Sequence, residues 1–106
     1  MATATSQPLI EELIRIAESD FHNERRAETR MPFFRPVSIA IDGYRFPGFM
    51  REISLTSVGL SHNMELPLKE VEVTVTGQEE GFRVRLTRCQ PCGEGWYLSG
   101  GKVLDG

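Results

Sequence analysis

The sequence has little of what builds disulfide frameworks, metal centres or membrane spans. Its 106 residues include two cysteines and two histidines, too few for a disulfide framework and in keeping with a reducing compartment. No continuous run of about 18 apolar residues occurs, and the first 20 residues lack the basic and apolar regions of a secretory signal. We therefore expect a soluble, cytoplasmic protein without membrane insertion.

The chain also lacks an excess of positive charge. Its formal net charge is -3 and its isoelectric point is about 5.4, whereas general binding to DNA or RNA relies on a broadly basic surface. No recognisable motif brings together a serine, a histidine and a carboxylate, and no phosphate-cradling glycine loop is present. These absences argue against a nucleic-acid partner and against an enzyme.

Positive charge is nevertheless concentrated in "NERRAETRMPFFRP", residues 23–36. This stretch contains four arginines: Arg25, Arg26, Arg30 and Arg35. One interpretation is a solvated loop in which they pair with Glu24 and Glu28. The other is a local anion site, because a protein with this overall charge can attract an anion only locally.

Helical periodicity is confined to the N-terminal part. An apolar stripe predicts a helix near residues 7–20, with Ser6 as N-cap; the stripe consists of Leu9, Ile10, Leu13, Ile14 and Ala17. It could cover an open end of the rest of the domain or mediate a homodimer, and we expect covering. Residues 21–35 are polar, and Met31 before Pro32 disfavours helix, which predicts a loop or extended arm. Phe33 and Phe34 are both expected in the core, and the alternative for one of them is a lid over a ligand or the arm.

From Pro36 onward the pattern predicts β-structure. The expected strands are 36–41, 44–53, 70–75, 82–87, 95–99 and 101–104, with a tight turn at Asp42-Gly43 and an edge, bend or bulge at Pro47-Gly48. One helix followed by six short strands predicts a mainly β protein, a small antiparallel six-stranded barrel.

The strands at 70–75 and 82–87 can be aligned on paper. Their apolar and charged faces are both satisfied by four cross-strand pairs: Val75 with Phe82, Val73 with Val84, Val71 with Leu86, and Glu72 with Arg85. A slip of one residue would invert every side chain, so the alternation restricts the register.

Two short motifs resemble those of the PilZ domain, a family of small β-barrel receptors for cyclic di-GMP. "RAETR" matches the family's RxxxR motif with Arg26 and Arg30, and "EISLTS" takes the place of its (D/N)xSxxG motif. The resemblance covers about residues 24–104. It implies a barrel domain at 23–106 with an arginine arm at 23–35, preceded by a helical extension at 1–22.

The resemblance implies a cyclic di-GMP site made of two halves. Its candidate ligand-binding residues are Arg25, Arg26, Arg30, Glu52, Ser54 and Ser57. The arm would close over the ligand and signal to a partner protein through changed arm and helix packing, with no cofactor, catalytic group or metal. Glu52 replaces the family's Asp or Asn, and Ser57 replaces its glycine. If that position needs positive φ, serine adds strain. The alternative is a barrel that has lost nucleotide binding and acts through protein contacts.

"RCQPCGEGW" is the other candidate site. Cys89 and Cys92 have the spacing of half a zinc site or of a dithiol motif. Three interpretations stay open: a structural hairpin turning at Pro91 and Gly93, a metal shared across a dimer, or redox chemistry.

Overall fold

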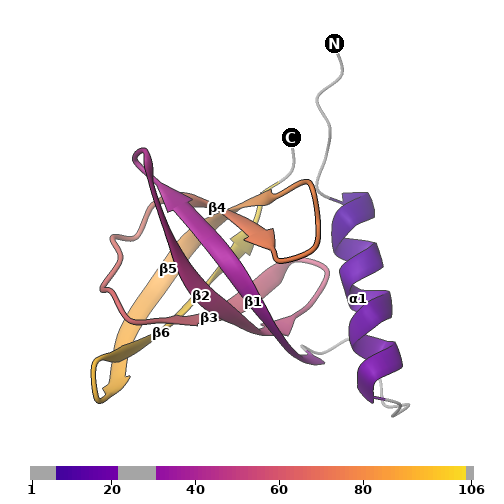
Figure 1. The fold of residues 1–106 in the computed structure, drawn as a ribbon, viewed down its shortest axis with the longest axis horizontal. Helices are drawn as coiled ribbons and strands as arrows, with labels where there is room; N and C mark the ends of the chain where they lie inside the picture. The colour runs from indigo at the N-terminus through magenta and orange to yellow at the C-terminus, as the bar shows by residue number, and fades with distance from the viewer. Residues whose placement is uncertain (1–6, 22–30, 105–106) are drawn as a thin grey trace.

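The computed structural model describes residues 7–21 and 31–104, which form one helix and a closed antiparallel barrel (Figure 1). The elements are α1 (Gln7–Phe21), β1 (Met31–Ile41), β2 (Tyr44–Ile53), β3 (Ser57–His62), β4 (Glu70–Val75), β5 (Phe82–Gly93) and β6 (Trp96–Val103). The strands follow the order β1-β2-β3-β6-β5-β4, and β4 pairs with β1 to close the barrel. The predicted mainly β, six-stranded barrel with an N-terminal helix is confirmed.

The helix α1 packs its apolar stripe against the barrel. Ile10, Leu13 and Ala17 are fully buried and belong to the same hydrophobic core as the strands. Figure 1 shows α1 lying beside the start of β1 and the loop that joins β4 to β5. Within the described ranges, no helix is long and apolar enough to span a bilayer.

The first hairpin confirms one prediction and corrects another. Asp42 and Gly43 have φ of 52° and 84°, the left-handed pair typical of a two-residue hairpin turn. However, β1 begins at Met31 instead of Pro36, so of the predicted loop or extended arm, residues 31–35 are extended and belong to the first strand. A β-bulge between Pro32 and Arg35 breaks the alternation of buried and exposed residues there. The sequence pattern therefore did not indicate a strand.

The number of strands was predicted correctly, but their assignment was partly wrong. The sequence pattern missed β3, whose buried positions are almost continuous and do not alternate. The two final strands are one, β6, because Gly100 and Gly101 pair with β3 and β5 and do not break the strand. β5 extends to Gly93, so its hairpin turns at Glu94 and Gly95, which have φ of 59° and 83°.

The β4–β5 register differs by two residues from the predicted one. Val73 pairs with Phe82, and Glu70 pairs with Arg85. A shift of two preserves which side chains face the core, so alternation alone could not detect it. Val75 is paired with β1, and the loop between β4 and β5 is correspondingly longer.

His62 is a fully buried polar residue inside the barrel. One ring nitrogen, Nδ1, lies 2.6 Å from the carbonyl oxygen of Met64, which can only accept, so Nδ1 carries the proton. Nε2 therefore accepts a hydrogen bond from the Ser99 hydroxyl at 2.6 Å. Burial lowers the pKa of His62, partly offset by the bond to Met64.

We predict that the barrel loses stability in mild acid through His62. Because the folded state depresses the pKa of His62, the unfolded chain binds the proton more readily, and the free energy of unfolding falls as pH drops below about 6.5. Urea unfolding between pH 7.5 and 5 measures this slope. The His62→Gln variant should show a shallower slope, and equal slopes would contradict the assignment.

Candidate functional site

One row of paired residues crosses five strands of the barrel and passes through three β-bulges. The row runs Pro32, Glu52, Gly59, Gly100 and Arg88, on β1, β2, β3, β6 and β5 respectively. In each of β1, β2 and β5 the register shifts by one residue next to this row. Bulges re-aim side chains and are common beside functional sites.

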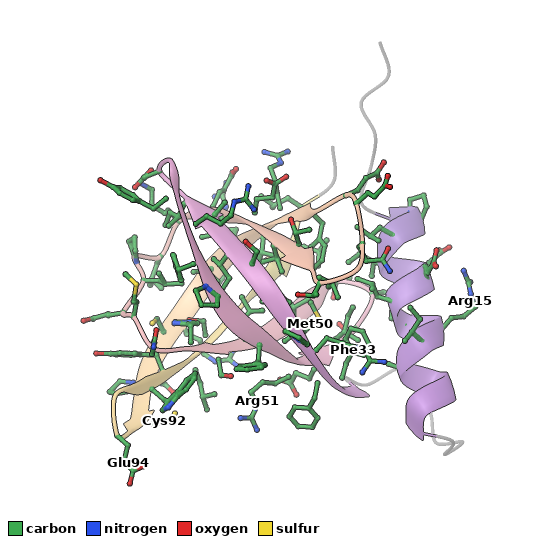
Figure 2. All side chains as sticks on the ribbon, viewed as in Figure 1. Arg15, Phe33, Met50, Arg51, Cys92 and Glu94 are labelled. Atoms are coloured by element: carbon green, nitrogen blue, oxygen red, sulfur yellow. The ribbon has the colours of Figure 1, made fainter. Side chains whose placement is uncertain are left out.

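The bulge in β2 turns two consecutive charged side chains toward the outer surface. Met50 and Ile53 are fully buried on either side of Arg51 and Glu52, and Arg51 is the extra residue in the pairing with β3. Figure 2 shows Arg51 projecting from the outside of the barrel. Its guanidinium lies 5.4 Å from the ring centroid of Phe34.

A pocket of about 360 Å³ lies over the row. Its walls come from β1, β2, β3, β5 and β6, and its lining residues are Phe34, Arg51, Glu52, Gly59, Leu60, Arg88, Leu98 and Ser99. The pocket therefore combines one carboxylate, two guanidinium groups and an exposed aromatic ring on one outer face.

Gly59 allows the Glu52 side chain to lie across β3. A Cβ atom at Gly59 would stand 2.9 Å from both Cγ and Oε2 of Glu52, closer than real side chains approach. Gly59 is a paired residue of β3 and lies outside the β2–β3 turn. Because it has no side chain, its backbone lines the bottom of the pocket.

Gly100 has the same relation to Arg88. A Cβ atom there would stand 2.6 to 2.8 Å from Cζ and both terminal nitrogens of the Arg88 guanidinium. Gly59 and Gly100 are direct partners across β3 and β6. The two glycines thus leave a patch of the sheet without side chains of its own. The Glu52 side chain lies over Gly59, and the Arg88 guanidinium lies over Gly100.

Ser54 and Ser57 close the turn between β2 and β3. The Ser54 hydroxyl accepts hydrogen bonds from the backbone N–H groups of Thr56, at 3.3 Å, and Ser57, at 3.1 Å. It also lies 3.0 Å from the Ser57 hydroxyl. Among the described non-glycine residues, Asp42 and Glu94 alone have positive φ, so serine in the glycine position of the motif carries no left-handed strain.

The structure thus brings three of the predicted ligand-binding residues to one region: Glu52, Ser54 and Ser57. The other three, Arg25, Arg26 and Arg30, lie outside the described residues. The arm that carries them joins β1 at Met31, which pairs with Ile53, next to Glu52.

Residues 31–35 of the arm are described and belong to β1. Phe33 is buried as expected, but Phe34 is 61% exposed, so its assignment to the core was wrong. The bulge in β1 turns its ring outward, where it forms part of the pocket wall. Arg35 donates to the carbonyl of Phe34 at 3.1 Å and lies over the ring of Phe33.

Sequence reasoning missed Arg51 and Arg88. Both are exposed arginines on strands whose alternation is interrupted, so a strict period of two does not give their orientation. The available signal was indirect: glycines inside a strand mark sites of close approach, and Gly59 and Gly100 are such residues.

Neither cysteine lines the pocket. Cys92 lies near the tip of the β5–β6 hairpin (Figure 2), and Cys89 accepts a weak hydrogen bond from the Leu66 N–H at 3.5 Å. Three residues of extended strand separate Cα atoms by about 10 Å, beyond the reach of a disulfide at about 7 Å. In the described part of the chain, no three His, Cys, Asp or Glu side chains are grouped to hold a metal.

The fold and the pocket define a small β-barrel binding module. The family model for the PilZ domain matches residues 24–104, and the chain belongs to this family, whose members are cyclic di-GMP-binding adaptors and not enzymes. A search of curated proteins found no match.

We predict that the Ser54 hydroxyl stabilises the β2–β3 turn. Ser54→Ala removes the acceptor for two backbone N–H groups and should lower the free energy of unfolding by about 1 to 2 kcal/mol. Thr56→Ala removes an exposed hydroxyl from the same turn and should change it by less than about 0.5 kcal/mol. Equal effects of the two substitutions in urea unfolding would contradict this role.

Proposed function

We propose that this protein is a cytoplasmic cyclic di-GMP receptor that signals to a partner protein. The observation that carries the proposal is the pocket over Gly59 and Gly100, with Glu52 and Arg88 on opposite sides, beside the strand into which the arginine arm leads. The ligand has two guanines and two phosphates, and this pocket offers a partner for each kind of group.

Glu52 is suited to the edge of a guanine. Its carboxylate can accept from the N1–H and N2–H groups, although it reaches further than the aspartate typical of the family motif. Gly59 leaves room for this longer side chain to lie along the sheet, which supports a working site in spite of the substitution.

The arginines supply the complementary contacts. A guanidinium group can fork onto phosphate oxygens or onto guanine O6 and N7, and can stack on a purine. In the proposal, Arg25, Arg26 and Arg30 approach from the arm while the barrel holds the base. Ser54 and Ser57 stabilise the β2–β3 turn through their mutual hydrogen bonds. In the proposal, Ser54 also lies near the bound guanine.

The connection between α1 and β1 suggests how binding becomes a signal. Residues 22–30 join the end of α1 to the start of β1, and α1 packs on the barrel through Ile10, Leu13 and Ala17. A ligand that draws the arm onto the pocket would act on the end of α1 and on the start of β1. A partner protein could then recognise the changed packing of α1 on the barrel.

A second candidate is a barrel that has lost the nucleotide and acts through protein contacts alone. Two observations favour it: the Ser54 hydroxyl is already engaged within its own turn, and an exposed aromatic pair lies near the pocket. Phe49 and Trp96 are 45% and 39% exposed with ring centroids 6.4 Å apart. Arg51 and Leu98 border both this pair and the pocket.

Calorimetry with cyclic di-GMP separates the two candidates. We expect micromolar binding by the unsubstituted chain and a loss of at least about tenfold for Arg30→Ala, since a charge-assisted contact contributes about 1.5 to 3 kcal/mol. Arg45→Ala, on the β1–β2 hairpin, is the control and should bind normally. No heat at high ligand concentration would favour the second candidate.

The double substitution Glu52→Asp with Ser57→Gly restores the family motif. If the natural residues form a weakened ligand site, this variant should bind cyclic di-GMP more tightly in the same titration. An unchanged affinity would contradict the hypothesis that Glu52 and Ser57 weaken the site.

A further inference from the structure

Arg88 differs from the other outward-facing arginines of β5. Arg83 and Arg85 both form ion pairs with Glu70, at 3.1 and 2.9 Å. Across the ranges 7–21 and 31–104, no carboxylate forms an ion pair with Arg88. Its guanidinium instead lies at the pocket, over the backbone of Gly100.

The orientation of this guanidinium follows from three distances. Cζ and the two terminal nitrogens are 2.6, 2.6 and 2.8 Å from the position that a Cβ atom of Gly100 would occupy. An edge-on group would place its nitrogens clearly closer than Cζ. Nearly equal distances mean that the guanidinium presents a flat face to Gly100, so its other face is directed away from the sheet.

A flat guanidinium with an outward face is a stacking surface for a planar base. Arginine stacks on aromatic rings through its delocalised plane, whereas the ammonium of lysine is a point charge and cannot. Glu52 lies over Gly59, where its carboxylate can accept from the edge of a base placed over the two glycines.

We propose that Arg88 is a ligand-binding residue that stacks on a guanine of cyclic di-GMP, with Gly100 required to seat its guanidinium. This inference rests on the proposed function. It adds to the two motifs a third contact, from β5, and makes binding depend on the shape of the Arg88 side chain as well as on its charge.

The test is calorimetric titration of the full chain with cyclic di-GMP. Arg88→Ala and Arg88→Lys should each weaken binding by about tenfold, because lysine keeps the charge but not the plane. Arg85→Ala removes an exposed arginine of the same strand that is paired with Glu70. It should stay within about twofold of the unsubstituted chain.

Gly100→Ala tests the seat without removing the arginine. The three heavy atoms nearest to the new Cβ all belong to the Arg88 guanidinium, the far end of a flexible side chain, so the barrel should keep its melting temperature within a few degrees while affinity falls as in Arg88→Ala.

Each outcome bears on a different part of the proposal. Lysine at position 88 binding as well as arginine, or Gly100→Ala binding normally, would overturn the stacking role. Normal binding by Arg88→Ala would overturn any contact with the ligand. If the unsubstituted chain does not bind cyclic di-GMP, the proposed function itself fails. That result is distinct from binding that only the variants lose or keep.

Discussion

The pairing of two glycines across β3 and β6 is the constraint on which the candidate site depends. The outer face of a sheet normally carries a side chain at every second residue. At Gly59 and Gly100 two adjacent positions are bare, and side chains from the flanking strands occupy the space. A Cβ atom at either position would approach Glu52 or Arg88 within 3 Å. The bulges in β2 and β5 complete the arrangement because they aim these side chains along the sheet.

The same row of residues links the pocket to the rest of the chain. It begins at Pro32, at the start of the strand that follows the arginine arm, and the arm in turn follows α1. An adaptor has no need of a catalytic group; it needs a ligand whose contacts change the packing of a segment that a partner can contact. In the proposed function α1 is this segment, because it packs on the barrel through a buried apolar stripe.

The barrel was largely predictable because most of its strands alternate regularly. The alternation around Val73 and Val84 gave two strands and their faces, and Asp42-Gly43 gave a turn. The β4–β5 register was predicted wrongly because a shift of two residues preserves the alternation. Strand bounds were predicted wrongly where bulges and glycines interrupt the period of two: at the start of β1, in β3 and at Gly100. Those interruptions also build the pocket. The family motif pointed to Glu52, whereas no pattern in the sequence pointed to Arg88. Its position depends on pairing between strands distant in the chain.

Amide chemical-shift mapping would locate the ligand on the barrel. In a titration of the isotope-labelled chain with cyclic di-GMP, the largest shifts among the described residues should come from Glu52, Gly59 and Arg88, which line the pocket. Gly100, which pairs with both Gly59 and Arg88, should shift with them. Largest shifts at the Asp42-Gly43 hairpin, or no shifts at saturating ligand, would contradict a cyclic di-GMP site over Gly59 and Gly100.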